Sequence, residues 1–190
     1  MARLLFLSGS TRAGSINVKL QNAAASYAKS QGFDTTEISL KDYPLAIYDG
    51  DDEAANGLPD AAQALSDVFV AHHGIFIASP EYNAGVTPLL KNAIDWLSRI
   101  PGPSGPPAFA DKIFAIGAAS PGGFAGVRAS LMLRHTLTTG LGQIVLGKQA
   151  LLPGAGDAFE EDGSLKEGRS RDMMEATVSE LHKVATALHG

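Results

Sequence analysis

One segment, residues 74–97, restricts the fold of this chain more than any other part of the sequence. It begins with a short apolar run, continues through a polar loop at 79–86, and ends with apolar residues at helical spacing. Thr87 is suited to cap that helix, and Pro88 to fill its first position, where no backbone N–H group is needed. A buried strand, a loop and an amphipathic helix in this order predict an α/β fold.

The same alternation continues along the whole chain. The sequence predicts strands at residues 3–7, 34–40, 74–78, 113–118 and 143–146. It predicts helices starting near residues 16, 60, 88 and 127, the fourth of them ending at 139, and a last helix from Met174 to Leu188. Residues 41–58 are expected to be a long loop, and the proline-rich residues 100–109 a stiff surface loop. The 190 residues contain no repeats, so we expect residues 1–190 to form a single domain.

Strands that alternate with helices usually pair in parallel, with helices covering both faces of the sheet. Right-handed crossovers place all the carboxyl ends of such strands at one edge, where α/β proteins bind their ligands. We therefore expect the loops at 8–17, 79–86 and 118–126 to converge at that edge.

The first of these loops has the residue types of a phosphate site. It joins a strand to a helix N-terminus, where free N–H groups and the helix dipole attract an anion. The candidate ligands of a phosphate monoester are Ser10, Thr11, Arg12, Ser15, Ile16 and Asn17. The loop lacks the lysine of a Walker loop and the glycine spacing of a Rossmann fingerprint, so neither motif applies. The alternative is an ordinary capped turn without a ligand.

The second loop contains groups that suit a flat aromatic ligand. A rigid turn, a carboxylate, an aromatic ring and an amide come from Pro80, Glu81, Tyr82 and Asn83. Such a ligand needs apolar contact and a few hydrogen bonds at its polar edge. We expect Glu81 to position other groups rather than to act as a general base. For Tyr82, the alternatives are an exposed loop aromatic or a subunit contact.

The third loop follows the fourth strand and is rich in glycine. Its candidate contacts to a flat ligand are Ser120, Gly122 and Gly123, because glycines let the backbone approach a ligand closely. The alternative is a turn with glycine bends and no ligand. Arg128, which begins the next helix, would either meet nucleotide phosphates or pair across a subunit interface. Trp96 is expected to be a core or subunit-contact residue.

Composition excludes several classes of protein. A formal net charge of −5 disfavours nucleic acid as a partner. The absence of cysteine removes disulfides, thiol nucleophiles and iron–sulfur clusters, so redox chemistry would require an organic cofactor. The five histidines lack ligand spacing, and we expect no metal site. No apolar run is long enough for a membrane helix, and we expect a cytoplasmic protein.

From Leu4 to about Leu188, the chain resembles the NADPH-dependent FMN reductase family of flavodoxin-like quinone, chromate and azo-compound reductases. The resemblance rests on the first loop, on residues 79–97 and on the glycine-rich third loop. It implies a three-layer sandwich with five parallel strands in the order 2-1-3-4-5. It also implies that FMN phosphate lies on Ser10, Arg12, Ser15 and Asn17, with the flavin ring along residues 80–83 and bordered by the third loop. The loop at 101–107 looks longer than the family's usual link.

The resemblance implies an FMN-dependent NAD(P)H oxidoreductase. NADPH would pass hydride to the flavin, which would then reduce a quinone, a free flavin, an azo compound or a metal oxyanion. The flavin itself performs this chemistry, so no side chain is predicted to be catalytic. The family further implies a homodimer or homotetramer. The alternatives are a flavodoxin-type electron carrier and a flavin-bound redox-sensing interaction protein.

Overall fold

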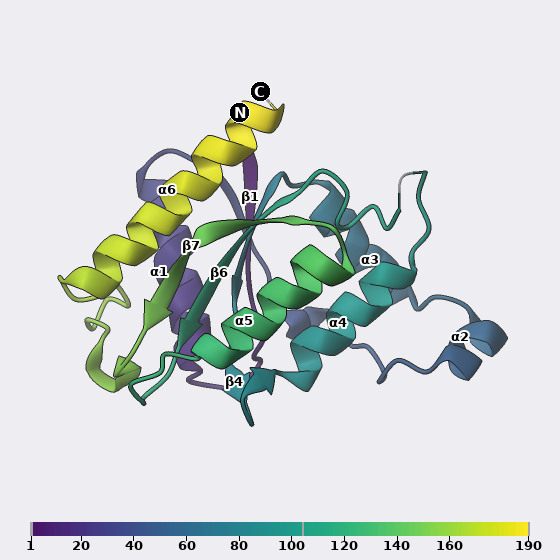
Figure 1. Ribbon diagram of the computed structural model, residues 1–190, viewed down its shortest axis with the longest axis horizontal. Helices are drawn as coiled ribbons and strands as arrows, with labels where there is room; N and C mark the ends of the chain where they lie inside the picture. Colours follow the sequence, from purple (N-terminus) through teal and green to yellow (C-terminus); the bar gives the residue numbers. More distant parts are fainter. Residues whose placement is uncertain (1, 104, 190) are drawn as a thin grey trace.

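The computed structural model describes residues 2–103 and 105–189. Its central sheet consists of β1 (Arg3–Ser8), β2 (Asp34–Glu37), β3 (Gly74–Ala78), β6 (Ile113–Ala119) and β7 (Ile144–Leu152). All neighbouring strands are parallel, in the spatial order β2-β1-β3-β6-β7 (Figure 1). Counted among these five strands alone, the order is 2-1-3-4-5, which confirms the flavodoxin-like topology expected from the sequence.

Helices cover both faces of this sheet. One face is covered by α1 (Ile16–Ser30) and α6 (Arg169–His189), and the other by α3 (Asp60–Val70), α4 (Pro88–Arg99) and α5 (Val127–His135). The strands are apolar at consecutive positions because each residue meets one of the two helical layers. Leu4 and Phe6 pack toward α1 and α6, whereas Leu5 and Leu7 pack toward α3 and α4.

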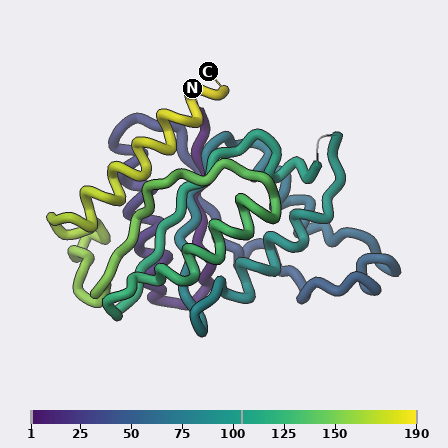
Figure 2. The backbone as a smooth tube through the Cα atoms, in the orientation of Figure 1, coloured from purple at the N-terminus to yellow at the C-terminus, as the bar shows by residue number. Residues whose placement is uncertain are grey.

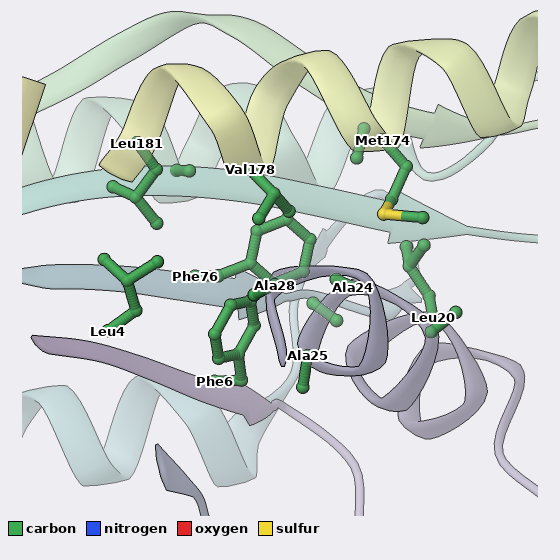
Figure 3. Packing of buried hydrophobic residues seen from close by; sticks show 14 of the residues in the cluster. Leu4, Phe6, Leu20, Ala24, Ala25, Ala28, Phe76, Met174, Val178 and Leu181 are labelled. Atoms are coloured by element: carbon green, nitrogen blue, oxygen red, sulfur yellow. The ribbon is translucent and has the colours of Figure 1, made fainter. Parts of the chain in front are cut away.

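The layer beneath α1 and α6 shows how the packing works. Figure 3 shows Phe6 and Phe76 between alanines of α1 and the apolar side of α6, which presents Met174, Val178 and Leu181. The small alanine side chains let α1 lie close to the sheet, while the larger residues of α6 fill the space above it. On the other face, Trp96 of α4 is fully buried, as expected for a core residue, and its Nε1 donates to the Ala46 carbonyl at 2.8 Å.

The structure corrects the predicted bounds of several elements, and the last helix begins at Arg169 instead of Met174. The fifth strand extends to Leu152 instead of ending at 146, and its pairing with β6 shifts register between Phe114 and Ile116. Arg134 stabilises this irregular stretch by donating to the carbonyls of Val145 and Leu146, at 3.1 and 2.5 Å. The fourth helix ends at His135 and continues as a π-helical turn, η2 (Thr136–Gly140).

The segment predicted as a long loop contains two short helices. A 3₁₀ turn, η1 (Leu40–Asp42), follows the second strand, which ends at Glu37 rather than at 40. The helix α2 (Gly50–Asn56) has no buried residue and projects from the body of the molecule (Figure 1). Tyr48 and Arg99 anchor it through hydrogen bonds to Glu53 of 2.9 and 2.8 Å.

The tube in Figure 2 shows that β1 begins and α6 ends on the same side of the molecule, at the amino edge of the sheet. The three loops expected to bind a ligand leave the opposite, carboxyl edge. Within the described residues, no helix is both long and apolar enough to span a bilayer.

Candidate active site

The three candidate loops begin side by side at the carboxyl edge. Backbone hydrogen bonds continue the sheet past the ends of its strands, from Gly9 N to Ala78 O at 2.9 Å and from Ser79 N to Gly117 O at 2.8 Å. A third bond joins Ser120 N to Leu152 O at 3.1 Å. The convergence expected from the sequence is therefore present.

The first loop presents hydrogen-bond donors at the N-terminus of α1. Ser15 caps this helix by accepting from Val18 N at 3.4 Å, and the Ser10 hydroxyl accepts from Arg12 N at 3.3 Å. Each serine hydroxyl still has its own hydrogen to donate. Among the described residues, no partner is found for the N–H groups of Ile16 and Asn17, and the first turn of α1 contains no acidic residue. This helix end therefore suits an anion.

Arg12 adds a positive charge beside these donors. Its side chain is exposed, and its nearest polar contact is the Ala13 carbonyl at 3.4 Å. It forms no ion pair within the part of the chain that the structure describes. Thr11 beside it is exposed as well. The guanidinium is therefore available to an anionic ligand at the loop.

Asn17 has a structural role besides the ligand contact expected from the sequence. Its buried side chain donates to Ala119 O and accepts from Ala119 N, both at 2.9 Å. Nδ2 keeps a second hydrogen, so Asn17 can donate to a ligand through this side-chain atom as well as through its backbone N–H. This pair of hydrogen bonds ties the first loop to the start of the third. No local sequence pattern predicts a hydrogen bond between residues so far apart in the chain.

Gly9 and Thr87 fix the first loop against α4, a role that the sequence analysis missed. The Thr87 hydroxyl donates to Gly9 O at 2.7 Å and accepts from Leu90 N at 3.4 Å. A Cβ atom at position 9 would lie only 3.0 Å from both Leu90 Cβ and Thr87 Oγ1. Glycine is therefore needed here for close packing. The cap at Thr87 was predictable, but its second partner was not.

The second loop forms a small hairpin of β4 (Glu81–Tyr82) and β5 (Gly85–Val86). Its turn residues, Asn83 and Ala84, have φ values of 50° and 66°, the left-handed conformation of a tight hairpin turn. Asparagine tolerates this conformation, which gives Asn83 a structural reason besides any ligand contact. Pro80 is buried at the base of the hairpin, whereas 51 % of Tyr82 is exposed.

Glu81 connects this hairpin to α5. Its carboxylate accepts from the backbone N–H groups of Arg128 and Ala129, at 3.1 and 3.3 Å, and pairs with the Arg128 guanidinium. Gly126 at the N-cap has no side chain, so Glu81 caps the helix in its place. Partial burial favours the neutral form of Glu81, but the hydrogen bonds from Arg128 and Ala129 outweigh it and lower the pKa of the carboxyl. Glu81 thus fixes the hairpin on α5, and its role as a positioning residue for a ligand stays a prediction.

The third loop is fixed by the segment after β7. Gly154 N donates to Gly122 O at 3.2 Å, and Ala155 N, in the short turn η3 (Ala155–Asp157), donates to Ser120 O at 2.9 Å. The glycines face open space: a Cβ at Gly123 would meet nothing within 4 Å, and one at Gly122 only Ser120 Oγ at 3.9 Å. The packing of the chain does not require these glycines, so a flat ligand has room against their backbone.

A cavity of about 440 Å³ adjoins the first loop at Thr11. Its other walls come from residues 40–46 and from Leu89, Asn92 and Ala93 of α4. The sequence analysis had assigned residue 40 to the end of the second strand and residues 41–46 to a long loop. In the structure this segment lies next to the first loop, the candidate phosphate site.

Comparison with known proteins shows which family has this fold and these loops. The family of NADPH-dependent FMN reductases matches residues 2–157 of the chain. The chain belongs to this family. The NAD(P)H-dependent FMN reductase of Pseudomonas aeruginosa is 32 % identical over 190 residues, covering 99 % of this chain and 97 % of that protein. The quinone reductase of Escherichia coli K12 is 34 % identical over 152 residues, covering 80 % and 77 % of the two chains.

A solved structure agrees with this fold. The flavoenzyme NAD(P)H:(acceptor) oxidoreductase of Paracoccus denitrificans superposes with a TM-score of 0.82 at 23 % identity, over 98 % of both chains. As an NADPH-dependent FMN reductase, the protein is an oxidoreductase that uses FMN and takes electrons from NAD(P)H. The family, fold, function and cofactor expected from the sequence are thereby confirmed.

The residues of the three loops fit the cofactor of an FMN reductase. FMN combines a doubly ionisable phosphate with a large flat ring system. The first loop has donors without partners and an arginine without an ion pair among the described residues, and the third has open space over glycine backbone for a ring. Asn17 holds these two loops together.

Proposed function

We propose that the three loops at the carboxyl edge hold FMN and that the protein reduces quinones with electrons from NAD(P)H. The observation that supports this most is the pairing of two features at one edge. The donors at the N-terminus of α1, which have no partner among residues 2–103 and 105–189, lie on a loop that Asn17 joins to an open glycine-rich loop.

The phosphate is proposed to bind in the first loop. Its ligands are the hydroxyls of Ser10, Thr11 and Ser15, the Arg12 guanidinium and the backbone N–H groups of Ile16 and Asn17. A phosphate monoester accepts several bonds at once and is stabilised by the positive end of the helix dipole. The supporting observation is that these groups lack partners among the described residues, apart from the two serine oxygens and Arg12 Nη1, which donates to Ala13 O.

The ring is proposed to lie between the hairpin and the third loop. The contacts are Pro80, Tyr82 and Asn83 on one side and Ser120, Gly122 and Gly123 on the other. Glu81 holds the hairpin on α5 and so fixes the spacing between these walls. Bound FMN supplies the two-electron chemistry that links NAD(P)H to an acceptor. The protein's part is to bind and orient the reactants.

A quinone is the acceptor that the rim of the site favours. Tyr82 and Phe124 are 51 % and 73 % exposed, and the Arg128 guanidinium lies 5.8 Å from the Phe124 ring centre. Exposed aromatic rings suit a flat, uncharged ring through stacking. Several relatives are named quinone reductases or NAD(P)H:quinone oxidoreductases. Chromate and azo compounds remain acceptors to test beside the quinone.

The proposal includes a homodimer or homotetramer in the cytoplasm. Next to the site, α5 exposes Leu131 and Met132 by 57 % and 44 %. Neighbouring apolar side chains of this kind suit a subunit contact. Sedimentation of the FMN-loaded protein at several concentrations tests the assembly, and a monomer at all of them would contradict it.

The deciding experiment is an anaerobic titration of the FMN-loaded protein with NADPH, followed by flavin absorbance. Bleaching by about one equivalent, reversed by a benzoquinone and by chromate more slowly, is the expected result. A flavin spectrum that NADPH leaves unchanged would favour the carrier or redox-sensing alternative. Failure to retain any flavin would contradict the proposed site.

A further inference from the structure

A second hollow lies at the amino edge of the sheet, on the side opposite the three loops. Its volume is about 900 Å³, and its walls come from the ends of α3 and α6, the residues before β6, and the turn before β7. Figure 1 shows the end of α6 beside the start of β1 on this side of the molecule. The proposed function leaves this hollow unused.

Lys112 forms the polar part of the hollow. The residue is 8 % exposed, and its Nζ donates to the Val70 carbonyl at 3.2 Å. An ammonium has three hydrogens, so this bond leaves two without a described partner. No carboxylate among the described residues lies within ion-pair distance of Nζ. Burial lowers the pKa of Lys112, because desolvation disfavours the charged amine; the Arg3 charge adds to this effect and Asp111 opposes it.

Two histidines lie beside this lysine in the wall. The rings of His73 and His189 stack with centroids 4.6 Å apart. His73 Nδ1 accepts from Arg3 N at 3.1 Å, so the neutral ring carries its hydrogen on Nε2. Asp111 is the acidic residue in the wall, and it is exposed. The wall therefore provides hydrogen-bond donors and one ammonium that has no ion pair in the described part of the chain.

The rim of the hollow is aliphatic. Val70, Ile144 and Leu188 line it, and they are 46 %, 55 % and 57 % exposed. These three residues come from different elements, α3, β7 and α6, yet they meet around one opening. Exposed apolar residues gathered around a hollow indicate contact with a ligand or partner.

We propose that this hollow binds a small amphipathic carboxylate, such as a medium-chain fatty acid. The single ammonium of Lys112 matches one negative charge, with His73 as an additional donor to the carboxylate. The aliphatic rim matches the hydrocarbon body. A multiply charged phosphate fits less well, because Asp111 offsets part of the positive charge and the rim is apolar. The inference does not depend on the flavin site.

Titration calorimetry with decanoate on the FMN-loaded protein tests the proposal. We expect saturable binding of decanoate. Acetate should not bind because it lacks the hydrocarbon chain, and decyltrimethylammonium should not bind because it carries the opposite charge. Lys112→Met should weaken decanoate binding by about tenfold or more, because a charge-assisted hydrogen bond is lost. Lys166→Met, which alters an exposed lysine elsewhere, should leave the affinity unchanged.

A second variant distinguishes loss of binding from misfolding of Lys112→Met. Leu188→Asp changes an exposed residue in the last turn of α6, so the fold should persist while the rim becomes acidic. We expect it to weaken decanoate binding as well. In nuclear magnetic resonance spectra, decanoate should shift the ring signals of His73 and His189. Absence of saturable binding, or equal binding by wild type and both variants, would overturn the proposal.

Discussion

Among single residues, Asn17 and Glu81 fix the shape of the candidate site by joining its loops to one another and to a helix. Asn17 joins the first loop to the third, and Glu81 joins the hairpin to α5. The sequence indicated the right neighbourhood for both, because polar residues after a strand in an α/β protein lie near ligands. Their partners, Ala119 and Arg128, lie in distant parts of the chain, and no local pattern predicts such pairs.

Asn17→Ala removes two buried hydrogen bonds and leaves both backbone atoms of Ala119 unpaired. We expect the free energy of unfolding to fall by about 1–3 kcal/mol, and FMN to be retained less well. Urea denaturation followed by circular dichroism measures the first effect. Asn22→Ala, at an exposed position of the same helix, is the control and should change little.

Arg12→Ala tests the phosphate role separately from stability. Because Arg12 is exposed and unpaired among the described residues, the variant should unfold at the same urea concentration as wild type. The dissociation constant for FMN should rise by about 10- to 100-fold, measured by quenching of flavin fluorescence. Arg169→Ala is the matched control at another exposed arginine. Unchanged affinity in Arg12→Ala would remove Arg12 from the site.

Ala84→Gly tests the strain in the hairpin turn. Ala84 has a φ of 66°, which is unfavourable for a residue with a side chain. Glycine relieves that cost, but it also adds freedom to the unfolded chain. We expect a net gain of about 0.5–1 kcal/mol in the free energy of unfolding, measured by urea denaturation. A loss of stability would show that the Ala84 side chain makes a favourable contact.

At the scale of elements, the sequence predicted the strands that are buried on both faces. It missed segments whose residues do not form a continuous apolar run or an amphipathic repeat. The fifth strand was cut short at 146 because Gly147, Lys148 and Gln149 interrupt its apolar run. The register shift against β6 accommodates these residues. The hairpin and α2 were missed because neither has a buried apolar face longer than a few residues.

The cap of α5 gives an expected pH dependence. Glu81 has a lowered pKa in the folded protein, so its contribution is complete above the unfolded pKa of about 4.3 and is lost as the pH falls through the folded pKa. Glu81→Gln should reduce the free energy of unfolding by about 1 kcal/mol at pH 7. The difference from wild type should shrink below about pH 4. A difference that stays constant from pH 7 to pH 3 would contradict the charged cap.

At the scale of the whole molecule, topology could be predicted because each strand and helix has a clear apolar pattern and the crossovers have one hand. The convergence of three loops at one edge followed from that topology. The hollow at the amino edge could not be predicted in this way. Its walls bring together residues between 70 and 144 with Leu188 and His189 near the end of the chain, and their meeting depends on how α6 packs on the sheet.

Cofactor binding should stabilise the whole fold. Free FMN at a hundred times its dissociation constant should raise the free energy of unfolding by about 2.7 kcal/mol, since it binds the folded state alone. Riboflavin at the same concentration should raise it less, because it lacks the phosphate. Thermal unfolding followed by circular dichroism compares the two ligands. Equal shifts would contradict a phosphate site in the first loop.

The link between Asn17 and Ala119 has a consequence for the speed of cofactor uptake. Because folding itself orders the two loops, their conformational entropy, about 1–2 kcal/mol for each residue, is lost before FMN arrives. Binding then resembles the docking of a ligand to a preorganised receptor. FMN association should accordingly follow a single exponential whose rate rises linearly with concentration, without a slow unimolecular step.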